Sequence, residues 1–280
     1  MPAGDAIHGG SLELGRCMDF LTLFNSAPLL LALLKAALPQ AVATTMAFGQ
    51  WFASVPPCRD FTFEATSYLV CEVDPKQYSV ELFWKDQTGK PFQSLHNLDA
   101  AQRMAGRTML FAINAGMYHP DLRPVGLYVE RGREMATVKT GSGSGNFSLQ
   151  PNGIFYVSDG RAAVRATRDF VRKRPPTDYA TQSGPMLVID GQLHPKFQAD
   201  GTSRKTRDGV GVRKDGVTVF AISNGTVTFH AFARLFRDAL GCDNALFLDG
   251  TISSLLAPAI GRNDDYWNLG PMIGVFRKSG

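Results

Sequence analysis

The stretch ALFLDGTISSLL, at residues 245–256, shows how this chain folds. Its apolar run from Ala245 to Leu248 has the length of one buried strand and stops abruptly at Asp249 and a glycine. A charged residue at the end of a buried strand is costly unless something pairs with it. The stretch therefore predicts a strand that delivers Asp249 to a polar site at its end.

The same pattern recurs along the chain, because short apolar runs alternate with Asp-Gly and Arg-Gly turns. The predicted strands are 62–73, 79–84, 108–113, 126–130, 134–138, 154–157, 162–164, 185–189, 209–212, 217–222, 226–229 and 246–248. One helix is predicted, at 231–240, and Gly241 ends it. Strands that do not alternate with helices predict an α+β fold whose core is a mixed, mostly antiparallel sheet.

Composition and charge describe an ordinary globular protein. The chain has 280 residues, 44% of them hydrophobic, and a formal net charge of +4. No break in composition divides residues 60–280, so we predict a leader at 1–45 and a single domain at 46–280. Basic residues gather at 161–174, which indicates a solvated face or, alternatively, an anion-attracting rim. No aromatic residues interleave with them in the manner of nucleic-acid binding, so no nucleic-acid partner is expected.

The N-terminal stretch predicts export. Residues 18–43 are mostly apolar and end in Ala41-Val42-Ala43, which resembles a small-residue cleavage site. We therefore predict a signal peptide and a secreted or periplasmic protein, with a retained amphipathic or membrane-anchoring helix as the alternative. Pro28 and Lys35 shorten the apolar run below the ~20 residues of a membrane-spanning helix. No stable membrane span is expected after processing.

Cysteine usage agrees with an oxidising compartment. Cys58 and Cys71 flank a strand-like run and are placed to close a small loop, whereas Cys242 is left over as a buried apolar residue. No Cys-x-x-Cys motif, phosphate-binding loop or dinucleotide fingerprint is present. We predict neither a cofactor nor a metal, although Asp190, Asp208 and Asp249 could together hold a hard cation.

Four apolar runs end in a glycine with a polar residue beside it. They are FAINAGMY (111–118), TQSGPMLV (181–188), RDGVGV (207–212) and LFLDGTISS (246–254). Glycine permits tight turns and close approach of a ligand. The runs therefore predict polar side chains gathered at strand ends, around one site. His119 directly follows the first run and is expected either to line that site or to face solvent.

The order and spacing of these segments resemble the phosphodiester glycosidase family over roughly residues 60–276, where RPVGLYVE, SGNF and PNGIF match as well. The family's strand-end asparagine, Ser-Gly pair, arginine and Asp-Gly pair correspond to Asn114, Ser183-Gly184, Arg207 and Asp249-Gly250. The resemblance implies Asp249 and Arg207 as catalytic residues. The candidate substrate-binding residues are Asn114, Gly116, His119, Gln182, Ser183, Gly184, Gly250 and Ser253.

This chain departs from the family pattern at two places. Thr251 and Ile252 stand where the family has glycines, and Asp208 stands beside the arginine in place of a small neutral residue. The added bulk narrows the freedom of the turn that follows Asp249. The added carboxylate changes the charge beside the arginine, and both changes bear on sugar specificity.

The family reaction cleaves the bond between an anomeric carbon and a phosphate oxygen. Most glycosidases use two carboxylic groups, one of which protonates the leaving oxygen. A phosphomonoester is a better leaving group than a sugar hydroxyl, so one carboxylate with an arginine can suffice. We expect Arg207 to bind the phosphate bidentately and Asp249 to act on the sugar as nucleophile, base or electrostatic partner. This requires the two side chains to converge on one polar cleft.

The expected substrate is thus a small-molecule or glycan phosphodiester. Two other functions fit the same residues. One is a non-catalytic binding module for an anionic cell-envelope glycan, which the departures at Thr251 and Ile252 favour. The other is a nuclease-like phosphodiesterase that cleaves phosphorus–oxygen bonds.

Overall fold

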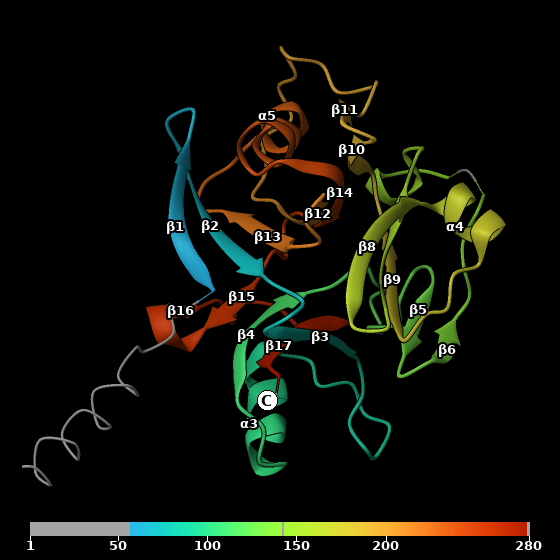
Figure 1. Cartoon of the computed structure of the whole chain (residues 1–280), viewed down its shortest axis with the longest axis vertical. Coiled ribbons are helices and arrows are strands. Elements are labelled where there is room, and N and C mark those ends of the chain that lie inside the picture. The colour runs from blue at the N-terminus through green and yellow to red at the C-terminus, as the bar shows by residue number, and fades with distance from the viewer. Residues whose placement is uncertain (1–56, 142, 279–280) are drawn as a thin grey trace, which may run out of the picture. The chain divides into compact units, whose positions relative to one another are not determined.

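The computed structural model describes residues 57–141 and 143–278, which fold into three β-sheets and a small number of helices (Figure 1). Every strand pair among these residues is antiparallel, which confirms the α+β prediction. The predicted leader at 1–45 lies outside the described residues. The predicted single domain at 46–280 extends beyond them and stays a prediction.

The first sheet has seven strands, and two of them lead to the candidate site. Their order is β1 (Cys58–Phe63), β2 (Thr66–Val73), β13 (Thr218–Ser223), β12 (Asp208–Arg213), β14 (Cys242–Asp249), β10 (Met186–Ile189) and β11 (Gln192–Leu193). One face is covered by α5 (Phe229–Arg234) and the π-helical turn η3 (Leu235–Ala239). Phe232 and Phe236 pack there against strand residues such as Phe247, so most of this face is apolar.

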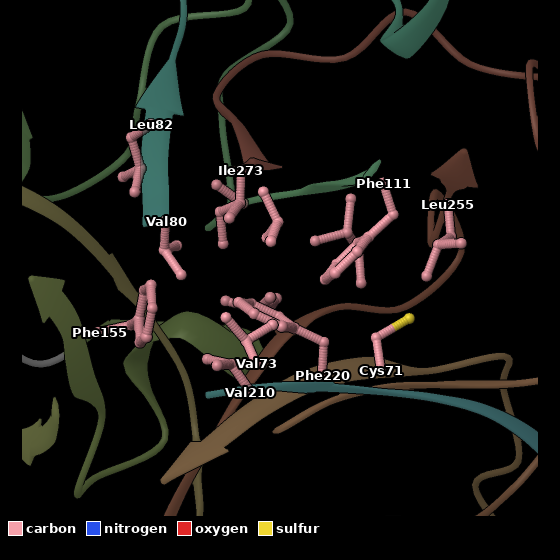
Figure 2. Packing of buried hydrophobic residues seen from close by; sticks show 14 of the residues in the cluster. Cys71, Val73, Val80, Leu82, Phe111, Phe155, Val210, Phe220, Leu255 and Ile273 are labelled. Carbon is pink, nitrogen blue, oxygen red and sulfur yellow. The ribbon is translucent and has the colours of Figure 1, made fainter. Parts of the chain in front are cut away.

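The second sheet has five strands and packs on the other face of the first. Their order is β16 (Arg262–Asn263), β15 (Leu255–Ala257), β4 (Met109–Asn114), β17 (Met272–Arg277) and β3 (Tyr78–Phe83). Figure 2 shows Phe111 and Ile273 facing Phe220 and Val210 across the main core. The outer face is covered by α3 (Leu95–Met104), whose first turn is capped by the Ser94 hydroxyl.

The third sheet also has five strands. Their order is β6 (Arg133–Ala136), β5 (Tyr128–Glu130), β9 (Tyr179–Ser183), β7 (Gly153–Ser158) and β8 (Arg161–Ala166), with α4 (Thr167–Lys173) directly after β8. Two 3₁₀ turns complete the elements: η2 (Asn146–Ser148) and η4 (Pro258–Ile260). Phe155 joins this sheet to the main core (Figure 2). The basic stretch 161–174 lies on β8 and α4, where Arg172 pairs with Asp169 at the surface.

Two of the predicted elements are wrong, and a third differs only in its bounds and helical geometry. The single strand predicted at 62–73 is a hairpin, because Glu64 and Ala65 take left-handed φ angles of 48° and 59° and reverse the chain. Residues 226–229, predicted as a strand, instead lead into α5. The Thr228 hydroxyl accepts from the Ala231 N–H and caps the first turn of this helix. The helix predicted at 231–240 begins two residues earlier and changes to π geometry at Leu235.

The predicted disulfide is present. Cys58 and Cys71 are bonded, and they are opposite each other in the β1–β2 pair. Disulfides of this kind persist in oxidising compartments, so the bond fits an extracellular location. Cys242 is a buried free thiol, as expected. Within residues 57–278 as described, no helix combines the length and apolar character that a membrane crossing requires.

Candidate active site

Three strand ends meet at the candidate site. Asn114 ends β4, Asp208 begins β12 and Asp249 ends β14. Asp208 and Asp249 are partners across the sheet, and a β-bulge follows, since Gly209 pairs with Phe247. Bulges re-aim side chains at the ends of strands. The site is thus assembled from two sheets, with β4 contributed by the second.

Asp208 is a fully buried carboxyl group. Its Oδ1 accepts from the Asp249 backbone N–H at 2.9 Å and from the Ser253 hydroxyl at 3.2 Å. Its Oδ2 has no hydrogen-bond partner among the described residues. Burial and then the neighbouring Asp249 charge raise the pKa of Asp208 well above its ordinary value, against hydrogen bonds from Asp249, Ser253 and Asn114. Burial thus favours the protonated form of Asp208.

Asp249 is the more exposed member of the pair, and it is only half-buried. Burial raises the pKa of Asp249 to about 6, and the N–H of Gly250, which donates to Oδ1 at 2.6 Å, opposes the shift. Burial, and secondarily the Asp249 charge, also raises the pKa of Tyr118. At neutral pH Asp249 is mostly ionised, whereas burial favours the protonated form of Asp208. A pair of this kind can supply both an anion and a proton donor.

The turn after β14 ties the site together. The Ser253 hydroxyl reaches the Gly250 carbonyl at 2.6 Å as well as Asp208, and the Ser254 N–H donates to Asn114 Oδ1 at 2.8 Å. None of residues 250–252 takes a left-handed φ angle, so the turn accepts Thr251 and Ile252 where relatives have glycines. Ile252 also packs against the apolar cluster beneath α3.

Arg207 lies on the opposite face of the first sheet from Asp208, beside α5. Its guanidinium is 3.5 Å from the centroid of the Phe229 ring, and its Nε and Nη2 donate to the carbonyls of Val227 and Ser203 at 3.1 and 3.2 Å. Arg207 forms no ion pair within the described part of the chain. Burial lowers the pKa of the guanidinium to about 10.

The expected convergence of Arg207 with Asp249 is therefore not seen as a direct contact. Neighbouring residues of an extended chain point to opposite faces, and Asp208 already faces Asp249. Phe247 lies near the guanidinium and near the turn after β14: its centroid is 5.4 Å from the guanidinium, and its Cζ is 3.5 Å from the position that a Cβ on Gly250 would take. Arg207 is thus a buried cation with no counter-charge among the described residues, and the Phe247 ring lies between its guanidinium and the turn after β14.

Gln182, Ser183, Gly184 and Gly116 form the framework of the site. The Gln182 amide makes four hydrogen bonds, with the N–H groups of Leu127 and Lys139, the Lys139 carbonyl and a threonine hydroxyl. The Ser183 hydroxyl donates to the Leu248 carbonyl at 2.8 Å and so fixes the end of β14.

The two framework glycines sit where no side chain fits. A Cβ on Gly116 would lie 2.3 Å from the Gln182 carbonyl oxygen, and one on Gly184 would lie 2.6 Å from Asn152 Cβ. His119 is exposed in the turn after β4, next to Tyr118. Its backbone N–H donates to the Arg123 carbonyl at 2.8 Å, which closes that turn.

Sequence reasoning missed the role of Asp208. The segment RDGVGV suggests a turn, and the family pattern has a small neutral residue at this position, so the sequence marks the carboxyl group only as a departure and as a possible cation ligand. The signal that could have found it is the pairing of two Asp-Gly steps at strand ends, 208–209 and 249–250. No cluster of three or more metal-ligating side chains is found among the described residues.

Comparisons with known proteins agree with this arrangement. A family model described as phosphodiester glycosidase matches residues 107–276. The Escherichia coli (strain K12) protein YigE, described as uncharacterized, is 34% identical over 183 residues, which is 65% of this chain and 71% of that protein.

Two solved structures share the fold. The catalytic domain of zebrafish N-acetylglucosamine-1-phosphodiester alpha-N-acetylglucosaminidase, auto-inhibited by its pro-peptide, has a TM-score of 0.54 and 17% identity, with 81% of this chain and 85% of that chain covered. A hypothetical protein from Synechocystis has a TM-score of 0.52 and 14% identity, with 79% and 61% covered. At these identities the structures show the fold alone. The family model spans more than half of the chain, and the matched segments supply the strand ends that build the site: the chain belongs to the phosphodiester glycosidase family.

Proposed function

We propose that this protein hydrolyses glycosyl-1-phosphodiesters. Water adds to the anomeric carbon, the bond from that carbon to the phosphate oxygen breaks, and free sugar and a phosphomonoester leave. The family is one of glycosidase-type hydrolases, and its model matches residues 107–276, which include the three strand ends of the site. The substrate is a small-molecule or glycan phosphodiester, met outside the cytoplasm as the disulfide suggests.

The observation that carries the proposal is the pair of carboxyl groups with unequal proton affinity. Glycosidases generally need one carboxylate and one carboxylic acid near the scissile bond. Asp249 and Asp208 supply this combination because their burial differs. The unequal burial of two neighbouring carboxyl groups is how enzymes separate an acid from a base at one pH.

Asp249 is the group that we assign to the sugar. Its carboxylate is the more exposed of the two, and it stabilises positive charge that develops at the anomeric carbon. Asp208 stays behind it, holds its proton and fixes the backbone of Asp249 through Oδ1. Asn114, Gly250 and Ser253 complete the polar surface around the pair.

Arg207 is assigned a long-range electrostatic role toward the phosphate and not the bidentate binding expected from the sequence, because it lies on the opposite face of the sheet from Asp208 and its guanidinium is bonded to two carbonyls. It is a buried cation with no counter-charge among the described residues, so an anion bound at the turn after β14 is attracted to it. Its two carbonyl hydrogen bonds and the Phe229 stack hold the guanidinium still. A preorganised charge stabilises a leaving phosphomonoester without reorganising during the reaction.

The test is to incubate the full chain with glycosyl-1-phosphodiesters in ¹⁸O-labelled water and measure free sugar. We expect sugar release with the label in the sugar, and on the order of 10²–10⁴-fold slower release by Asp249→Asn. Asp60→Asn, an exposed carboxyl on β1, is the matched control and should keep full activity.

Three outcomes contradict the proposal. Label in the phosphate would identify a phosphodiesterase that cleaves phosphorus–oxygen bonds. Tight binding of an anionic glycan with no sugar release would identify a binding module. Wild-type turnover by folded Asp249→Asn would remove this residue from the mechanism.

A further inference from the structure

The loop before β17 presents two exposed aromatic side chains next to the candidate site. Tyr266 and Trp267 are 78% and 46% exposed, and they are neighbours in sequence. The other large apolar side chains exposed in the described part of the chain are Met104, Met135 and Ile260, none of them aromatic. Single exposed apolar residues are common on protein surfaces, but adjacent aromatic ones are typical of binding surfaces.

Both ends of this loop are fixed to residues of the site. At one end, the Asp264 N–H and carboxylate bond the backbone of Leu255, which follows the Ser254 bonded to Asn114. At the other end, the Tyr118 hydroxyl donates to the Asn268 carbonyl at 2.7 Å. The Asp249 charge acts on that same Tyr118. The two aromatic residues therefore lie on a loop held at both ends against the candidate site.

We propose that Tyr266 and Trp267 form a stacking platform for the sugar ring of the substrate. This inference rests on the proposed function and names the subsite where the sugar lies. The faces of a pyranose ring carry C–H groups, which pack against an aromatic ring while the hydroxyl groups stay at the edges. Two aromatic side chains supply large contact area at little cost in conformational entropy.

The charged residues of the loop indicate which part of the substrate lies over Tyr266 and Trp267. Asp265 lies beside it and is exposed, and the Asp264 carboxylate is paired with Arg262 at 2.8 Å. The loop from Asp264 to Asn268 contains no basic residue. An exposed carboxylate repels phosphate but accepts hydrogen bonds from hydroxyl groups. We therefore expect the sugar over this loop and the phosphate on the side of Asp249 away from it.

The test measures binding in an Asp249→Asn background, where turnover is suppressed. The probes are glucose 1-phosphate, N-acetylglucosamine 1-phosphate, their methyl glycosides without phosphate, and inorganic phosphate. Titration calorimetry should show that Trp267→Ala, alone or with Tyr266→Ala, weakens sugar binding by about tenfold or more and leaves inorganic phosphate unaffected. Met104→Ala, which removes a 91% exposed side chain at the end of α3, is the matched control.

The results separate this inference from the proposed function. If the platform variants bind every sugar probe as tightly as Met104→Ala does, or if no sugar probe binds at all, the platform is ruled out, even where wild-type protein releases sugar from a phosphodiester. If the variants lose affinity for methyl glycosides while wild-type protein releases no sugar, the platform stands and the hydrolase proposal fails.

Discussion

Replacing Asp249 by asparagine should stabilise the protein while it removes activity. Burial raises the pKa of this carboxyl group from 3.8 to about 6. A difference of this size between the unfolded and folded chain corresponds to about 3 kcal/mol in the free energy of unfolding. Asparagine has the same shape and no charge, and its Oδ1 can still accept from the Gly250 N–H.

The sign and the pH range follow from the direction of the shift. The unfolded chain releases the Asp249 proton near pH 3.8, but the folded chain holds it up to about pH 6. Stability from the protonated form is therefore complete below pH 3.8 and is lost as the pH rises through 6. Asparagine at position 249 does not titrate. The free energy of unfolding of the variant should therefore exceed that of wild type by an amount that grows from pH 3.8 to about pH 6 and is constant above it. Burial is the main cause of the raised pKa of Asp208 and acts in wild type and variant alike, so most of the Asp208 contribution cancels in this comparison.

Urea unfolding followed by circular dichroism, at several pH values from 4 to 8, measures the difference. We expect Asp249→Asn to be about 2–3 kcal/mol more stable than wild type at pH 8 and nearly equal to it at pH 4. Asp60→Asn, at an exposed position, should show no such pH-dependent gain. An advantage that is absent at pH 8, or that is the same at every pH, refutes the reasoning.

Three further predictions concern Gly116, Arg207 and the Cys58–Cys71 disulfide. Gly116→Ala should destabilise the fold by about 1–3 kcal/mol in urea unfolding, because its Cβ would lie 2.3 Å from a backbone oxygen, whereas Gly225→Ala, with open space around it, should not. Arg207→Lys should lower both thermal stability and the rate of sugar release, since lysine cannot keep two carbonyl bonds and the ring stack; full activity would show that a diffuse charge suffices. Reducing the Cys58–Cys71 bond should lower the free energy of unfolding by about 3 kcal/mol, as expected for a loop of this length; an unchanged urea midpoint in dithiothreitol would contradict this.

The strand ends could be predicted from the sequence because the apolar runs stop abruptly at polar residues. Asn114 and Asp249 were placed correctly at the ends of β4 and β14 for this reason. The hairpin turn at Glu64 and Ala65 was missed because neither residue is among those that favour left-handed φ angles. The helix α3 was missed because it is short and mostly polar, and its stability comes from packing under the second sheet.

The contacts between side chains could not be predicted in the same way. Asp208 begins β12 and Arg207 directly precedes it. The face of the sheet to which each side chain points depends on the register of three strands from distant parts of the chain. A one-residue change of register exchanges the two faces. The sequence thus indicated a carboxylate and a guanidinium near the site. It paired the guanidinium with Asp249, whereas the structure pairs Asp249 with the carboxyl group of Asp208.

The long sequence separations within the site have a consequence for biogenesis. The Asp208–Asp249 contact spans 41 residues and the Asn114–Ser254 contact spans 140. Chains dominated by such distant pairings fold slowly, since the ordering of long loops precedes the contacts that reward it. A nascent polypeptide that ends before β14 lacks Asp249 and the turn that follows it. The candidate site is therefore complete only after β14 has been synthesised and has paired with β12.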